Sequence, residues 1–155
     1  DDGVTLLLFL DDMDEGNGCM RIVPGSHKER FTHFKDGNFI GSTDPELFEQ
    51  FDGKADSIIG KAGDVCLMDI WALHGGGANL SKDRNRRMLI ADYRAADAFA
   101  LMPPAVPSRF YRRIDSGEAT HVPRLREGTM EILEPYPDDS FFGLQGQKAA
   151  GETVQ

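Results

Sequence analysis

The sequence predicts an all-β fold with minor helices, built as an antiparallel β-sandwich or jelly roll. Three observations favour this class: short runs rich in β-branched and aromatic residues, turn-forming residues between those runs, and one helix-bearing insertion. Short antiparallel strands joined by tight turns pack face to face around one core. A chain of 155 residues can bury such a core without disulfides, so we expect a single domain over residues 1–155.

The first two strands are predicted in residues 4–10 and 19–23. The run VTLLLFL at 4–10 is continuously apolar, which predicts a strand buried on both faces. The acidic segment 11–18 ends in Asn17-Gly18, a strong hairpin signal. Residues 19–23 alternate between polar and apolar and stop at Pro24-Gly25. We therefore expect the two strands to pair as a hairpin.

A polar excursion follows at residues 26–53, with five phenylalanines dispersed through it. A helix is predicted near residues 45–50, because Ser42, Thr43 and Asp44 supply capping side chains and Pro45 suits the first helical position. Residues 55–59 predict a short strand.

The most regular strands come next. Gly63-Asp64 forms a turn that leads into a strand at residues 65–73, and a last strand is predicted at 87–93. Beyond Ala95 six prolines interrupt the pattern. We expect a core at residues 3–94, an irregular proline-rich region at 95–155, and an exposed tail from 138 onward.

Composition excludes several classes of function. The net charge of −9 argues against a nucleic-acid surface and against an anionic membrane surface. No apolar run approaches the ~20 residues of a membrane-spanning helix. Cys19 and Cys66 lie far apart without metal-binding spacing, which favours a reducing, cytoplasmic setting. The chain opens with Asp1-Asp2 and a strand follows at once, so we expect a further portion upstream.

One histidine and one arginine carry the chemical signal. His74 ends the predicted strand 65–73 and is followed by three glycines, which allow close backbone approach. Histidine is the commonest side-chain metal ligand, and arginine holds a carboxylate with two parallel hydrogen bonds. Adjacent antiparallel strands could bring His74 and Arg86 into one pocket. This predicts a metal centre beside an acid-bearing cosubstrate, although a lone histidine at a strand end is more often structural.

Two ordered motifs resemble the phytanoyl-CoA dioxygenase family. The first is residues 10–27, LDDMDEGNGCMRIVPGSH, and the second runs from Gly63-Asp64 through His74 to Arg87. The resemblance covers roughly residues 3–93. It implies a double-stranded β-helix, a cupin-like jelly roll, and a dioxygenase that uses Fe(II), 2-oxoglutarate and O2 to hydroxylate an unactivated C–H of a small-molecule substrate.

The resemblance assigns roles to single residues. His74 matches an iron-binding histidine, and Arg86 matches the arginine that holds the far carboxylate of 2-oxoglutarate. The loop between them is one residue longer than expected, so Arg87 is an alternative, and strand alternation places only one of the pair inside. Asn79 and Ser81 would brace this loop as outer support.

The family's other two iron ligands come from a His-x-Asp motif, which these 155 residues lack. We expect that motif just upstream of Asp1. A second departure is Gly76, where the family often has a serine that helps bind 2-oxoglutarate.

The remaining polar candidates receive structural readings. His27 is predicted to shape a turn, and Asp64 to cap one. Carboxylates within strands are predicted to face solvent, with outer support of the site as the alternative. The residues in this group are His27, His33, Asp64, Asp69, Trp71 (core or pocket wall), Asp92 and His121.

Two rival functions remain beside the oxygenase. The first is a metal-free β-sandwich that binds a small ligand or a partner chain, which the missing His-x-Asp motif favours. The second is a cupin-like enzyme with a different metal, which would require further inward histidines. The sequence specifies neither the substrate nor the oligomeric state.

Overall fold

The computed structural model describes residues 3–99 and 108–125. The chain divides into two compact units. The first, the strand unit, consists of Asp2–Phe31 and Glu49–Arg94; the second holds Asp1, Thr32–Phe48 and Ala95–Gln155. The predicted tail at 138–155 lies outside the described residues. Within the described residues, no helix is long and apolar enough to cross a membrane.

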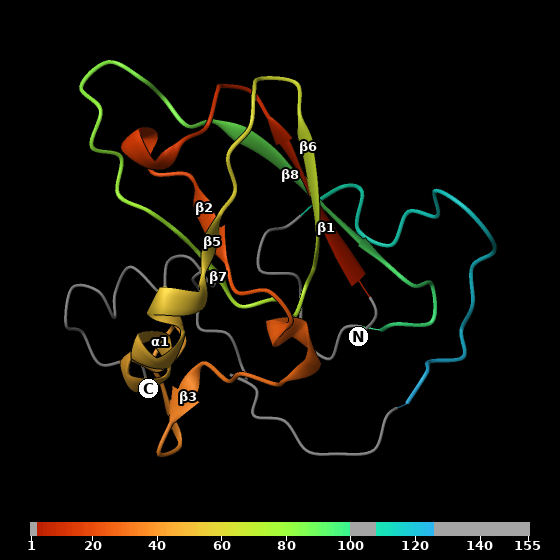
Figure 1. The fold of residues 1–155 in the computed structure, drawn as a ribbon. Coiled ribbons are helices and arrows are strands. Elements are labelled where there is room, and N and C mark those ends of the chain that lie inside the picture. The colour runs from red at the N-terminus through yellow and green to blue at the C-terminus, as the bar shows by residue number, and fades with distance from the viewer. Residues whose placement is uncertain (1–2, 100–107, 126–155) are drawn as a thin grey trace. The chain divides into compact units, whose positions relative to one another are not determined.

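The first sheet of the strand unit is built around β1 (Gly3–Phe9). This strand pairs antiparallel with β6 (Val65–Asp69) on one side and with β8 (Met88–Arg94) on the other (Figure 1). The register places Thr5 opposite Met68 and Asp92. The predicted strands at 4–10 and 87–93 are therefore confirmed to within a residue.

The second sheet is built around β2 (Met20–Ile22). It pairs antiparallel with β5 (Asp56–Ser57) and with β7 (His74–Gly76) (Figure 1). Two three-stranded antiparallel sheets of this kind give the layered architecture that the sequence predicts.

The core of the strand unit lies between the sheets. Its buried members come from both of them and from the loop that joins them: Leu7, Phe9, Met13, Cys19, Met20 and Met68. Side chains alternate along β1, so Leu7 and Phe9 are buried whereas Val4 is 40% exposed. The prediction that residues 4–10 are buried on both faces is wrong for the described chain, because the outward face also carries Leu67, which is 65% exposed.

The predicted hairpin between residues 4–10 and 19–23 is wrong. β1 and β2 lie in different sheets. The segment between them forms a short 3-10 helix, η1 (Glu15–Asn17), which the Asp14 side chain caps. Gly18 ends this helix with φ of 76°, and a Cβ there would lie 2.5 Å from the carbonyl oxygens of Gly77 and Ala78. The Asn-Gly pair thus ends a helix instead of turning a hairpin.

The predicted single strand at 65–73 is also wrong, because the chain changes sheet inside it. β6 ends at Asp69, whose side chain accepts a hydrogen bond from the Trp71 N–H at 2.8 Å. The Leu73 N–H then donates to the Ser26 hydroxyl of η2 (Ser26–Lys28) at 2.8 Å. This turn delivers His74 to the second sheet as the first residue of β7.

The second unit contains a hairpin that the sequence analysis missed. β3 (Phe34–Lys35) pairs with β4 (Asn38–Phe39) across Asp36-Gly37. Both turn residues have positive φ, 52° and 75°, as a tight hairpin turn requires. The Asp-Gly dipeptide was the available signal.

The predicted helix is confirmed as α1 (Pro45–Phe51). The Asp44 carboxylate accepts a hydrogen bond from the Glu46 N–H at 3.0 Å, as the capping signal predicts. The 3-10 helix η3 (Asp52–Lys54) follows directly, before β5 begins.

Asn17 provides a stability test, because its side chain is fully buried and bonded at three points. Its amide donates to the Asp12 and Asn85 carbonyl oxygens, and its oxygen accepts from the Asp14 N–H. We expect Asn17→Ala to lower the free energy of unfolding by about 3 kcal/mol, since it leaves buried backbone groups unpaired. Urea unfolding of the intact protein measures this. The matched control is Asn38→Ala at an exposed position; equal effects of the two variants would contradict the prediction.

Candidate functional site

A cavity of about 290 Å³ lies within the strand unit and is lined by residues from both sheets. Most of its wall is apolar, and four polar side chains reach it. The lining residues are Thr5, Leu7, Met20, Met68, Ile70, His74, Gly75, Gly76, Arg86, Met88, Ile90 and Asp92. A largely apolar cavity with a few convergent polar groups is the usual form of a small-molecule site.

His74 is oriented by the backbone just before it. Its Nδ1 lies 2.8 Å from the Ala72 carbonyl oxygen. A carbonyl oxygen can only accept, so Nδ1 carries a proton, and in the neutral ring Nε2 then keeps its lone pair. A histidine held in this way is suited to bind a metal through Nε2.

The described residues do not place a complete set of metal ligands around His74. Across residues 3–99 and 108–125, no three His, Cys, Asp or Glu side chains gather closely enough to hold a metal ion. The donor set fits a metal centre that takes its other ligands from outside the described chain, as the resemblance to a His-x-Asp family implies.

Arg86 reaches the same cavity from the residue pair before β8. A Cβ built on Gly76 would lie 3.1 Å from Nη1 and 3.2 Å from Nη2 of Arg86. A side chain at this position would therefore press on the guanidinium. The family resemblance leads us to expect serine at position 76. The glycine found there has no side chain to contact the Arg86 guanidinium.

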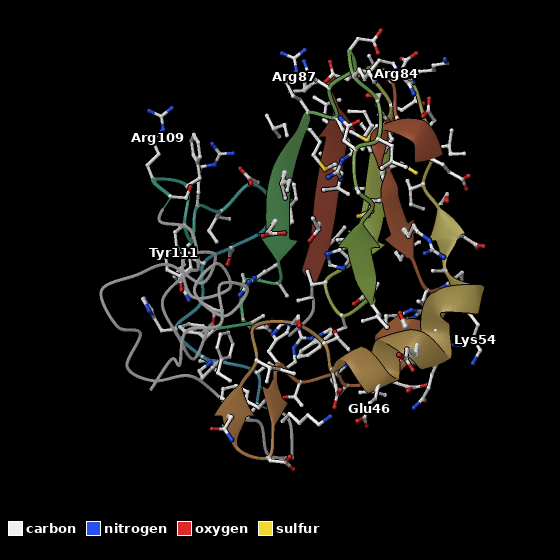
Figure 2. All side chains as sticks on the ribbon, turned by 90° about the vertical axis from the view of Figure 1, so that its left-hand side faces the viewer. Glu46, Lys54, Arg84, Arg87, Arg109 and Tyr111 are labelled. Carbon is white, nitrogen blue, oxygen red and sulfur yellow. The ribbon has the colours of Figure 1, made fainter. Side chains whose placement is uncertain are left out.

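Arg87 lies on the surface instead. Its Nε and Nη2 donate to the two Asp11 carboxylate oxygens at 2.9 and 2.8 Å, and its backbone N–H donates to Asp11 at 2.7 Å. The Arg87 guanidinium lowers the pKa of Asp11 to about 2. Figure 2 shows Arg87 directed outward at the end of the strand unit where Arg84 also lies. Arg86 is thus the member of the pair that lines the cavity.

Asn79 and Ser81 close the loop between His74 and Arg86. The Asn79 amide donates to the Arg84 carbonyl oxygen at 2.8 Å, and the Ser81 hydroxyl shares its single proton between the Asn79 side-chain oxygen at 2.7 Å and the Arg84 carbonyl oxygen at 3.0 Å. The Arg84 guanidinium in turn binds Asp14 and lowers the pKa of that carboxyl to about 2. These contacts fix the path of the chain between the two cavity residues.

The other sequence candidates, Asp92 excepted, do not line the cavity. Asp64 accepts from the Lys61 N–H at 2.7 Å and so caps its turn. His27, His33 and His121 are exposed. Trp71 lies under the Arg30 guanidinium, 4.1 Å from its ring centroid.

The sequence analysis did not name Thr5, and it gave Asp92 a role at the site only as the alternative to a solvent-facing one. Asp92 is exposed, as predicted, and its side chain also lines the cavity and accepts a hydrogen bond from the Thr5 hydroxyl at 2.6 Å. The alternation of side chains along β8 could have indicated that Asp92 shares a face with cavity residues. Met88, Ile90 and Asp92 share one face of that strand.

The half-buried Cys66 lies beside the core in the middle of β6. Burial raises the pKa of its thiol above the ordinary value. A protonated, half-buried thiol is a poor nucleophile and a poor metal ligand. Cys66 therefore behaves as a small apolar residue.

Two antiparallel sheets around a cavity with a histidine and an arginine place the chain among the jelly-roll proteins. Within that class, the chain belongs to the phytanoyl-CoA dioxygenase family, because the model of the family described as Phytanoyl-CoA dioxygenase (PhyH) matches residues 1–88. The family resemblance of the sequence is thereby confirmed.

Individual relatives agree with this assignment. The chain is 34% identical over 144 residues to a probable alpha-ketoglutarate-dependent hypophosphite dioxygenase from Stutzerimonas stutzeri, a match that covers 88% of this chain and 49% of the relative. The chain thus spans about half the length of this curated relative.

Solved structures confirm the fold class. EctD from S. alaskensis with 2-oxoglutarate and 5-hydroxyectoine superimposes with a TM-score of 0.55 at 22% identity, over 77% of this chain and 42% of that chain. The apoform of EctD from S. alaskensis superimposes with a TM-score of 0.52 at 23% identity, over 69% of this chain and 38% of that chain. At these identities the likeness concerns the jelly-roll fold.

The Asp11–Arg87 pair gives a pH-dependent test of which arginine faces outward. The pKa of Asp11 is lowered from 3.8 to about 2, so the pair stabilises the fold above the ordinary pKa and this contribution is lost as the pH falls through about 2. We expect Arg87→Met to raise the pKa of Asp11 toward 3.8, measured by NMR titration of its carboxyl carbon. Arg86→Met is the matched control and should leave the pKa of Asp11 low. An unchanged pKa of Asp11 in Arg87→Met would refute the outward placement of Arg87.

Proposed function

We propose that this protein is an Fe(II)- and 2-oxoglutarate-dependent oxygenase that hydroxylates an unactivated C–H of a small-molecule substrate. Family membership supports the proposal, as does the alpha-ketoglutarate dependence in the name of its Stutzerimonas stutzeri relative. The observation that carries it is geometric: His74, with a free Nε2, and Arg86 line one cavity.

His74 would be one of three iron ligands. Its Nδ1 bond to the Ala72 carbonyl oxygen fixes the ring and directs the basic Nε2 away from the backbone. A histidine and a carboxylate from a His-x-Asp motif preceding β1 would complete a facial triad. When bound, the iron supplies the oxygen chemistry, which no side chain can perform.

Arg86 would hold the far carboxylate of 2-oxoglutarate. Its guanidinium lies against Gly76, and His74 precedes Gly76 by two residues on β7, about 7 Å along a strand. This spacing suits a short dicarboxylate that reaches from the arginine to a metal at the histidine. The planar guanidinium can grip the carboxylate with two parallel hydrogen bonds.

The apolar wall would exclude water from the reacting groups. Leu7, Met20 and Met68 line the cavity and are buried, and Met88 packs against the same cluster. A dry wall strengthens the electrostatic contacts made inside it and protects a reactive site from side reactions. The chain's own contribution is therefore to orient the cosubstrate and to shield it.

A metal-free binding module is the second candidate. The observation that favours it is that no three metal-binding side chains gather among residues 3–99 and 108–125. Metal analysis of the intact protein separates the candidates: one equivalent of iron that is lost in His74→Ala supports the oxygenase. Stable binding of another metal would instead support a cupin-like enzyme of different chemistry.

Turnover tests the oxygenase directly. We expect the intact protein to release succinate from 2-oxoglutarate with iron and O2, and His74→Ala to abolish this release because an iron ligand is lost. His27→Ala, at an exposed histidine outside the cavity, is the control and should retain it. Loss in His27→Ala with retention in His74→Ala would reverse the assignment.

Cosubstrate binding separates the two arginines. Arg86→Met should weaken 2-oxoglutarate binding by on the order of 100-fold, since charge-assisted hydrogen bonds contribute about 2–3 kcal/mol. Arg87→Met should leave the affinity within about twofold, because its guanidinium is paired with Asp11 on the surface. Calorimetric titration with 2-oxoglutarate measures both affinities. A loss confined to Arg87→Met would make that residue the anchor.

Gly76 gives a steric test of the same pocket. Gly76→Ala places a methyl group about 3.1 Å from the Arg86 guanidinium, so the arginine must shift. We expect 2-oxoglutarate to bind about tenfold more weakly, as a displaced bidentate contact loses one good hydrogen bond. Gly75→Ala is the matched control, because a Cβ there meets no atom within 4 Å. Equal affinities in the two variants would contradict the steric account.

A further inference from the structure

We propose that Asp92 is a substrate-binding residue that selects a positively charged N–H group, such as a protonated amine. This inference rests on the proposed function, because it assumes that Arg86 and His74 are occupied by cosubstrate and metal. It concerns the remaining polar end of the same cavity, where Asp92 and Thr5 meet.

The geometry of β8 separates Asp92 from the cosubstrate end. Met88, Ile90 and Asp92 line the cavity in turn along one face of the strand, and Arg86 precedes them. β8 begins at Met88, so Arg86 lies two residues before the strand and Asp92 lies four residues beyond its start. A cosubstrate held between Arg86 and His74 would therefore leave the Asp92 carboxylate available to a substrate.

The Asp92 carboxylate has unused hydrogen-bonding capacity. Thr5 donates to Oδ1 at 2.6 Å, which orients the group, and a carboxylate can accept several further bonds. In the described part of the chain Asp92 forms no ion pair, although Arg94 lies two residues further along β8. A cationic N–H donor would balance the charge of this carboxylate and also donate a hydrogen bond to it.

The charge left in the cavity sets the expected selectivity. Among the described lining residues the guanidinium is that of Arg86 and the carboxylate is that of Asp92, and the cosubstrate would pair with Arg86. A negative charge beside the apolar side chains of Ile70 and Ile90 attracts a cation and repels an anion. Hypophosphite is an anion, so we expect this protein to differ in substrate from its Stutzerimonas stutzeri relative.

Matched probes test the proposal in the intact protein loaded with 2-oxoglutarate. Hexylamine, hexan-1-ol and hexanoate share one apolar chain and differ in charge, and calorimetry measures their binding. We expect hexylamine to bind at least about tenfold more tightly than hexanoate, in line with one charge-assisted contact. Asp92→Asn should remove this preference, and Asp92→Lys should reverse it toward hexanoate.

Controls separate this proposal from the proposed function. Asp83→Asn removes an exposed carboxylate outside the cavity and should keep the preference. Both Asp92 variants should retain 2-oxoglutarate binding, which also shows that they are folded. The inference is overturned if the unmodified protein does not favour hexylamine, or if Asp92→Asn and Asp92→Lys keep its preference. Failure of the unmodified protein to bind 2-oxoglutarate would instead overturn the oxygenase assignment.

Discussion

The buried side chain of Asn17 is the contact on which the geometry of the site depends. Its amide joins the Asp12 carbonyl oxygen to the Asn85 carbonyl oxygen, across 68 residues of sequence in the second case. Asn85 is the residue immediately before Arg86. The crossing between the sheets and the approach to the cavity arginine are therefore held by one fully buried group, whose bonds cannot be exchanged for water.

Local signals predicted the strands and the helix, whereas contacts distant in sequence determined how the strands pair. The run at residues 4–10 and the capped helix at Pro45 were readable because their signals are contiguous. The predicted hairpin does not form. The Asn17 side chain donates instead to the Asn85 carbonyl oxygen far along the chain, which the Asn-Gly dipeptide does not reveal. Likewise, the break after Asp69 depends on Ser26, a partner 47 residues from Leu73.

The candidate site divides in the same way. Resemblance located His74 and the adjacent arginines, and strand alternation indicated that only one arginine faces inward. The choice between Arg86 and Arg87 became visible in the structure, where Asp11 takes Arg87. The contact between Asp92 and Thr5 depends on strand register: β1 places Thr5 directly opposite Asp92, and no local pattern encodes that pairing.

The acidic segment at residues 11–14 explains why such a short loop can organise the cavity. Three of its carboxylates bind basic side chains from three later parts of the chain, in the pairs Asp11–Arg87, Asp12–Lys61 and Asp14–Arg84. Each exposed pair contributes little to stability. Together the three pairs fix where each basic side chain points, because each one binds a different carboxylate. With Arg84 and Arg87 held outside, Arg86 is the arginine left to enter the cavity, whose lining thus carries both a guanidinium and the Asp92 carboxylate. These two opposite charges, more than the cavity's volume, limit which molecules can bind in it.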